Sequence, residues 1–212
     1  MFTFRRSIAV FLLLLCSAVA SDAQGPPPRI GPYVVDVRAA FPRFPTDAAV
    51  AESRGLAQAE LPRGAIGIDV NAHVYVMKWK AVTVGLGGQL LHARAHTEAS
   101  EGGREVRERL TVFTPQLSLN FGSGDGWSYI SGGIGPSIWS IVPDGAQPLP
   151  ADEERLRTYN YGGGARWFTR RHLAVHFDLR FHVIAPGTPS GALPGSPAVN
   201  LLVLGAGVSL KP

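Results

Sequence analysis

Residues 171–184, RHLAVHFDLRFHVI, hold three of the six histidines of the chain together with a close Asp–Arg pair. His172 and His176 have the H-x-x-x-H spacing of zinc sites on helices, but a leucine stands where the catalytic glutamate of that motif would be. On an extended strand these two histidines would lie roughly 13 Å apart, too far to share one ion. Asp178 and Arg180 are two positions apart, so on a strand they share a face and can form an ion pair.

The same segment alternates between apolar residues and polar or small ones. Its apolar residues occupy every second position: Leu173, Val175, Phe177, Leu179, Phe181 and Val183. A period of two predicts an extended strand with two unlike faces. A soluble sheet would turn the charged face to water, whereas a membrane barrel would enclose it. The face that lies inside therefore decides the class of protein.

Seven other segments alternate in a similar way. Together the eight predicted strands cover residues 30–41, 64–78, 80–95, 107–121, 127–142, 156–168, 171–184 and 198–210. Within the fourth segment Pro115 falls on the apolar face, which predicts a local irregularity or bulge. Eight segments of about ten residues or more are typical of transmembrane β-barrels.

Long and short connections alternate along the whole chain. The long ones are residues 42–63, 96–106, 143–155 and 185–197, and the short ones are at Trp79, GSGDG (122–126) and Thr169–Arg170. Outer-membrane barrels have long extracellular loops, short periplasmic turns and both termini in the periplasm. We therefore predict an all-β fold, a closed antiparallel up-and-down eight-stranded transmembrane β-barrel.

The beginning of the chain predicts export. Residues 1–23 have the basic, apolar and small-residue parts of a signal peptide, with cleavage after Ala20 or Ala23. Residues 24–29 predict a Pro-rich spacer, and residues 30–212 the outer-membrane β-barrel domain. Cleavage would remove the single cysteine and with it any disulfide or thiolate. Loss of the two leader arginines lowers the net charge from +4 to about +2, which argues against a nucleic-acid binder.

The polar faces are predicted to lie inside the barrel. A bilayer requires a closed barrel, and an eight-stranded bore cannot hold about forty apolar residues. We expect a structural network of paired polar side chains in the lumen: Asp36, Arg38, Asp69, Asn71, His73, Arg166, His176, Asp178, Arg180 and His182. Aromatic residues near strand ends would suit the two interfacial girdles: Tyr33, Phe41, Trp79, Phe121, Trp127, Trp139, Trp167 and Phe168.

The hairpin YNYGGGARWFTRRHLAVHFDLRFHVI, Tyr159 to Ile184, resembles the penultimate hairpin of small bacterial outer-membrane β-barrel domains of the OmpA, OmpX and OmpW groups. In these domains a Gly-rich strand ends in an aromatic residue, a tight basic turn follows, and a strand with inward Asp and Arg returns. LNFG, Leu119 to Gly122, is also similar. The resemblance implies an eight-stranded barrel in a Gram-negative-type outer membrane, without the peptidoglycan-binding domain of longer relatives. It implies the outer-membrane insertion machinery as a partner, although this sequence ends in SLKP where such chains commonly end in an aromatic residue.

A set of arginines flanks the long connections: Arg94, Arg104, Arg107, Arg109, Arg155 and Arg157. In the predicted topology they face the cell exterior, where contacts with lipopolysaccharide phosphates would be favourable. Glu101, Glu105 and Glu108 lie in the same region, so a solvated loop is the alternative interpretation. Residues 46–62 could include a short amphipathic helix, and the sequence does not decide whether this loop is a lid, a partner contact or a plain loop.

The predicted function is a non-enzymatic, monomeric outer-membrane barrel with a structural or surface-interaction role, a plugged polar lumen and no large pore. We expect contact with outer-membrane lipids and no nucleic acid, catalytic centre, cofactor or metal, since the sequence has no G-x-S-x-G motif and its glycine runs have no strand–turn–helix context. The alternative is a secreted or periplasmic lipocalin-like barrel that binds a hydrophobic ligand. His92 near the outer rim motivates a third hypothesis, a lipid hydrolase or acyltransferase, but no H-x-S motif accompanies it.

Overall fold

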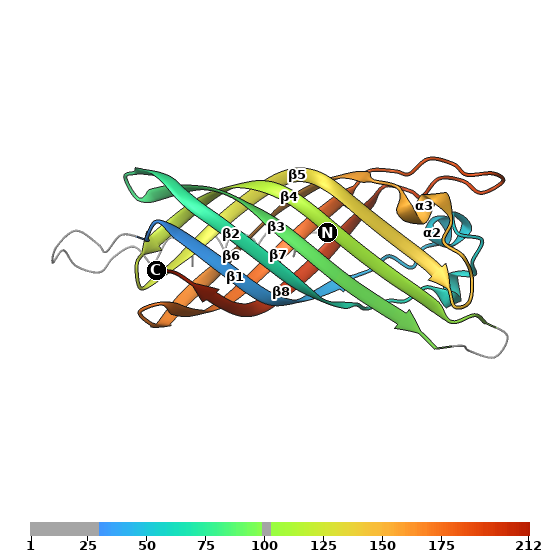
Figure 1. The fold of residues 1–212 in the computed structure, drawn as a ribbon, viewed down its shortest axis with the longest axis horizontal. Coiled ribbons are helices and arrows are strands. Elements are labelled where there is room, and N and C mark those ends of the chain that lie inside the picture. The colour runs from blue at the N-terminus through green and yellow to red at the C-terminus, as the bar shows by residue number, and fades with distance from the viewer. Residues whose placement is uncertain (1–29, 99–102) are drawn as a thin grey trace, which may run out of the picture.

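The computed structural model describes residues 30–98 and 103–212, which form a closed barrel of eight strands (Figure 1). Each strand pairs antiparallel with the next, and β8 pairs with β1 to close the barrel. The strands are β1 (Tyr33–Arg43), β2 (Ile66–Trp79), β3 (Val82–Thr97), β4 (Val106–Ser123), β5 (Gly126–Pro143), β6 (Leu156–Arg170), β7 (Leu173–Ile184) and β8 (Val199–Leu210). The predicted fold is confirmed, and each predicted segment overlaps one strand.

Connections of like length lie at the same end of the barrel. The tight turns at residues 80–81, 124–125 and 171–172 gather at one end, where β1 begins and β8 ends (Figure 1). The long connections lie at the opposite end. They include the short helices α2 (Ala48–Glu52), η2 (Gln58–Glu60) and α3 (Pro150–Glu153). None of the helices in the described ranges is long and apolar enough to cross a membrane.

Two of the tight turns begin slightly later than the sequence predicts. Trp79 still pairs with Val82, and Arg170 with Leu173, so the next two residues form each turn. In the first turn Lys80 has a φ of 52°, the left-handed conformation that tight hairpins favour. Register shifts in β2 and β6 place bulges close to both turns.

The irregularity predicted at Pro115 affects one edge of β4. Pro115 pairs in register with Gly88 of β3. On the other edge the β4–β5 pairing stops at Val112 and resumes at Gln116 in the same register. Pro136 of β5 lies in the facing gap, and neither proline has an N–H to donate. The ladder is interrupted there without a register shift.

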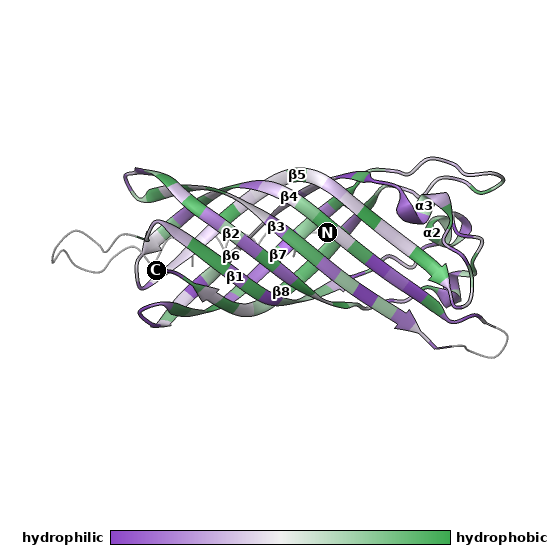
Figure 2. Cartoon of the chain, viewed as in Figure 1, coloured by the Kyte–Doolittle hydropathy of each residue, from purple (hydrophilic) through white to green (hydrophobic). Residues whose placement is uncertain are grey.

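The apolar strand faces point outward. Among the described residues, 27 large hydrophobic side chains are exposed, and they come from all eight strands. In β7, Phe177 and Leu179 are 51% and 45% exposed, whereas Asp178 between them is 7% exposed. The ribbon coloured by hydropathy shows this alternation along the strands (Figure 2). A lipocalin-like carrier would require the opposite arrangement, with apolar residues lining the bore and charges in water.

The aromatic residues divide between the outer wall and the bore. Tyr33, Phe41, Trp79, Phe121 and Trp167 are exposed on the outside, as the girdle prediction requires. The prediction is wrong for Trp127 and Trp139, which are 3% and 0% exposed inside the barrel. Both tryptophans have odd residue numbers in β5, whereas the outward-facing apolar residues of this strand, including Ile130 and Ile138, have even residue numbers. The face of the strand on which an aromatic residue lies, and not its distance from the strand end, therefore decides whether its side chain points outward.

Candidate functional site

A buried charge cluster from four strands lies in the turn-side half of the bore. Arg166 of β6 donates to Asp36 of β1 through Nε and Nη2, at 2.9 and 2.6 Å. Ser209 of β8 donates to Asp36 at 2.6 Å, and Nδ1 of His176 in β7 lies 3.4 Å from the same carboxylate. All four side chains are almost completely buried. The carboxylate therefore links strands that are far apart in the sequence.

A second cluster adjoins the first. Arg38 donates to Asp69 at 2.7 Å and lies 3.3 Å from Asp178. Arg180 donates to Asp178 through Nε and Nη2, both at 3.2 Å, and Tyr129 donates to the same carboxylate. Two arginines and two carboxylates thus alternate within one enclosed network. Charges buried in this way require such partners, because an unpaired charge there would be very costly.

Amide side chains extend this network across the bore. Gln89 donates to Asp69 at 2.6 Å, and Gln116 donates to Gln89 at 2.9 Å. Asn71 donates to Gln116 at 3.2 Å, and Asn160 of β6 to Gln89 at 2.6 Å. These bonds join side chains from four strands across the turn-side half of the bore.

Glycines lie directly opposite two of the buried arginines on the neighbouring strands. Arg38 pairs with Gly207 across the β1–β8 ladder, and Arg180 pairs with Gly162 across the β6–β7 ladder. A Cβ atom at Gly207 would lie 2.6 Å from the Arg38 Cα, and one at Gly162 would lie 2.7 Å from the Arg180 Cα. No side chain fits at these distances, so the close approach of the neighbouring strand's backbone requires glycine at both positions.

The remaining predicted lumen histidines are buried without complete hydrogen bonding. His73 and His182 are 2% and 0% exposed. Within the described ranges, Nε2 of His73 and both ring nitrogens of His182 have no hydrogen-bond partner. The described residues contain no group of three or more His, Cys, Asp or Glu side chains that could hold a metal ion. His172 is exposed in the last turn while His176 is buried in the bore.

The loop-side half of the bore is apolar, which corrects the expectation of a polar bore throughout. Leu91, Leu110, Ile184 and Leu201 are completely buried there, together with Trp139. The indole of Trp139 donates to the buried carboxylate of Glu108 at 2.6 Å. Apolar side chains can face inward at this end because a folded loop excludes water from them.

That loop, residues 44–62, is named the cap. Asp47 caps helix α2 by accepting from Val50 N at 3.0 Å. Apolar residues of the cap pack on the apolar half of the bore: Phe44, Val50, Ala51, Leu56 and Leu61. The first long loop therefore packs over the loop end of the bore.

Two ion pairs tie the cap to neighbouring loops. Arg54 donates to Asp152 of α3 at 3.0 Å, and both side chains are buried. Asp152 also accepts from the backbone N–H of Ile141 at 2.9 Å. On the other side, Arg104 donates to Glu60 at 3.0 Å through Nε and at 2.9 Å through its backbone N–H.

The hydrogen bonds that Glu60 accepts from Arg104 and Ala57 are predicted to weaken in acid. The hydrogen bond from the Arg104 side chain, followed by those from the backbone N–H groups of Ala57 and Arg104, lowers the pKa of Glu60 from its ordinary 4.5 to about 2. A lowered pKa in the folded state contributes stability that is complete above pH 4.5 and is lost as the pH falls through about 2. Hydrogen exchange of the Ala57 and Arg104 amides should accelerate over that window in the wild type. In Glu60→Gln these amides should exchange faster already at pH 6, and equal protection in both proteins at pH 6 would contradict the assignment.

The six predicted rim arginines are all exposed but differ in their partners. Arg104 is bound to the cap, and Arg107 forms an ion pair with Asp144. Arg155 follows α3, and the guanidinium of Arg157 lies 5.5 Å from the ring of the tyrosine two residues later. These four arginines are not held together in one site.

Arg94 and Arg109 form the remaining pair. They are directly opposite each other on β3 and β4, on the outward face and just beyond the apolar wall. In the described part of the chain neither forms an ion pair with a carboxylate. In the next outward-facing pair toward the middle of the barrel, Nδ1 of His92 lies 2.9 Å from the Thr111 hydroxyl. The sequence identified both arginines but not their pairing, which depends on strand register.

The sequence matches no protein-family model and no curated protein. Among solved structures, the neisserial surface protein NspA superposes with a TM-score of 0.55 at 11% identity, covering 86% of this chain and 98% of NspA. Ail, the attachment invasion locus protein of Yersinia pestis, in complex with the heparin analogue sucrose octasulfate, gives 0.50 at 13% identity over 84% and 97%. The chain has the eight-stranded outer-membrane barrel fold. In such a barrel the end with the tight turns is the periplasmic end and the capped end is extracellular.

Proposed function

We propose that the protein is an exported, monomeric outer-membrane barrel with no enzymatic activity, which acts at the cell surface by binding the phosphate groups of lipopolysaccharide. The apolar outer wall supports the location, because a soluble protein rarely exposes a continuous apolar patch larger than a few hundred Å². The buried network and the cap support a filled lumen without a large pore. Such a protein works through its surface.

The cross-strand pair of Arg94 and Arg109 carries the lipopolysaccharide proposal. Like charges directly opposite each other on a sheet destabilise it, and an anion bound to both arginines would offset the repulsion. Guanidinium groups bind phosphate oxygens in a bidentate way, and two of them side by side suit one phosphate.

The neighbouring residues support a location of this pair at the level of lipid phosphates. The next row toward the middle of the barrel combines Ile68 and Ile138 with His92 and Thr111. Ile68 and Ile138 are exposed on the outer wall. The row therefore marks the boundary between the apolar wall and the polar rim, which is where a lipid with phosphates above its acyl chains would present them.

The experiment compares two double variants, each of which loses two positive charges. Arg94→Ala/Arg109→Ala should weaken lipopolysaccharide binding by about tenfold to a hundredfold, since charge-assisted hydrogen bonds contribute about 1.5–3 kcal/mol and 1.4 kcal/mol is tenfold. Arg155→Ala/Arg157→Ala should bind nearly as well as the wild type. Binding is measured with fluorescent lipopolysaccharide on protein in phosphatidylcholine nanodiscs, with dephosphorylated lipopolysaccharide as a second ligand. Equal losses in the two variants, or unchanged binding after dephosphorylation, would contradict the site.

A further inference from the structure

The turn end of the barrel carries unpaired positive charge. All three lysines of the chain, Lys78, Lys80 and Lys211, lie there with Arg170 and Arg171. None of these five forms an ion pair within the described ranges, whereas Arg54, Arg104 and Arg107 at the capped end all do. Asp125 is the one acidic residue among the described turn positions. Among the described residues, the turn end therefore carries more positive than negative charge.

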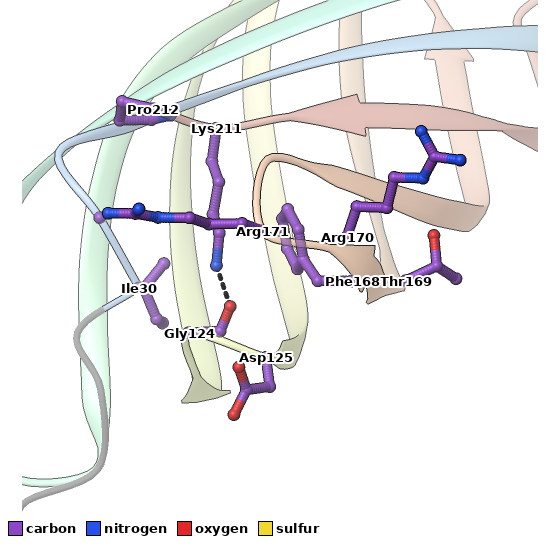
Figure 3. A pocket seen from close by; sticks show the side chains of 10 residues that line it. Ile30, Gly124, Asp125, Phe168, Thr169, Arg170, Arg171, Lys211 and Pro212 are labelled. Carbon is purple, nitrogen blue, oxygen red and sulfur yellow. Dashed lines mark hydrogen bonds between the residues drawn. The ribbon is translucent and has the colours of Figure 1, made fainter.

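A cavity of about 520 Å³ opens at this end. Its walls come from the start of β1, the β4–β5 turn, the β6–β7 turn and the segment after β8 (Figure 3). Strands from opposite parts of the barrel contribute, so the cavity lies across the barrel mouth and not on the lipid-facing wall. Its volume is in the range of small-ligand sites, and its occupant comes from the aqueous side.

The cavity has a fixed aromatic and apolar base. Phe168 stacks on Trp127, with ring centroids 4.9 Å apart and planes inclined by 23°. Trp127 is buried against Ile30 and Val34, which closes the bore at this level. The ammonium of Lys211 lies 3.9 Å from the Phe168 ring centroid and donates to the carbonyl of Gly124. These contacts fix the position of Lys211 beside the apolar base.

Three cationic side chains line the cavity. Arg171 extends across the opening toward Ile30, and Lys211 points toward Gly124 (Figure 3). Arg170 also lines the cavity, but its side chain extends to the other side of the turn. In the described part of the chain, neither the Arg170 guanidinium nor the Arg171 guanidinium has a hydrogen-bond partner. The site thus combines two guanidinium groups and one positioned ammonium with an apolar surface, and Asp125 is the one acidic residue in its lining.

We propose that this cavity binds the free carboxylate end of a short peptide with small apolar side chains, the chemistry that cell-wall stem peptides present on the periplasmic side. The carboxylate pairs with Arg171 and Lys211, since a guanidinium matches both carboxylate oxygens. The small apolar side chains lie on Phe168, which is only partly buried. A phosphate alone would use the cations but leave the apolar base uncovered. That the peptide comes from the cell wall rests on the proposed membrane orientation, whereas binding of the carboxylate does not.

The test uses the full chain in detergent micelles and the probe N-acetyl-alanyl-alanine, detected by saturation-transfer NMR of its methyl groups. The free acid should bind, and the C-terminal amide should bind at least tenfold more weakly. Arg171→Ala should weaken binding of the acid about tenfold, while Arg170→Ala, with the same loss of charge in the same turn, should weaken it much less because the Arg170 side chain extends to the other side of the turn. Lys211→Gln should also weaken binding. Heat-modifiable electrophoretic mobility establishes that each variant is folded.

Three results would overturn the proposal: no binding of the acid, equal binding of the amide, or equal losses in the Arg170 and Arg171 variants. Displacement of the acid by equimolar inorganic phosphate would show a general anion site and would also overturn it. None of these readouts involves lipopolysaccharide or Arg94, so failure here is distinguishable from failure of the proposed function. A membrane-impermeant thiol reagent on intact cells carrying Arg171→Cys tests the orientation separately, and labelling there would place the cavity outside the cell.

Discussion

Replacing Asp36 with asparagine is expected to lower the free energy of unfolding by about 3–5 kcal/mol, the usual cost of removing one partner of a buried ion pair. Asp36→Asn keeps the size of the side chain but removes the charge that Arg166, Ser209 and His176 share. Arg166 is 1% exposed and would be left with no carboxylate partner. The loss should therefore far exceed that of an ordinary surface substitution.

The matched control is Asp144→Asn, which removes the same charge from an ion pair with Arg107. Both side chains of that pair are about half exposed, so the expected loss is about 0–1 kcal/mol. Urea titrations in detergent micelles, followed by tryptophan fluorescence, give both values. Similar small losses in the two variants would mean that the interior network is hydrated and contributes little to stability.

Replacing Leu179 with arginine is expected to destabilise the protein in a bilayer by about 2–4 kcal/mol, the cost of an arginine on the lipid-facing wall near the middle of the membrane. Leu179 lies in the middle of β7, and its side chain points outward. The charge would have to be drawn toward an interface or deform the bilayer. In a water-soluble barrel the same exposed position would accept arginine with almost no effect.

Ile66→Arg is the depth control for this prediction. Ile66 also faces outward, but it pairs with Arg94 at the loop end of β2. A charge near the interface costs about 0–1 kcal/mol. Both variants are unfolded by urea from phosphatidylcholine vesicles, and equal small losses would contradict a lipid-facing wall.

The positions of the strands could be predicted from the sequence because each strand is marked by an alternation of apolar and polar residues within its own segment. In β7 every second residue from Leu173 to Val183 is apolar, and in β2 the polar set Asp69, Asn71 and His73 alternates with the apolar residues Ile68, Val70, Ala72 and Val74. A period of two does not depend on the rest of the chain. The alternation of long and short connections then gives the up-and-down topology, which the closed strand order confirms.

Features that depend on contacts between distant segments were missed. The apolar side chains in the bore, such as Leu110 and Leu201, break the rule of polar inside because the cap covers them. The cap itself is held by Arg54 and Asp152, which are 98 residues apart in the sequence. The pairing of Arg94 with Arg109 depends on a hairpin register that composition does not determine.

The most direct test of the central claim, that the apolar wall faces lipid while the polar face is enclosed, is fluorescence quenching of single tryptophans in vesicles. One variant carries Phe177→Trp with the four native tryptophans replaced by phenylalanine, and another retains only Trp139. Lipids brominated in the acyl chains should quench the tryptophan at position 177 strongly and aqueous iodide should not, whereas Trp139 should respond to neither. Quenching of position 177 by iodide, with no effect of brominated lipid, would contradict the claim.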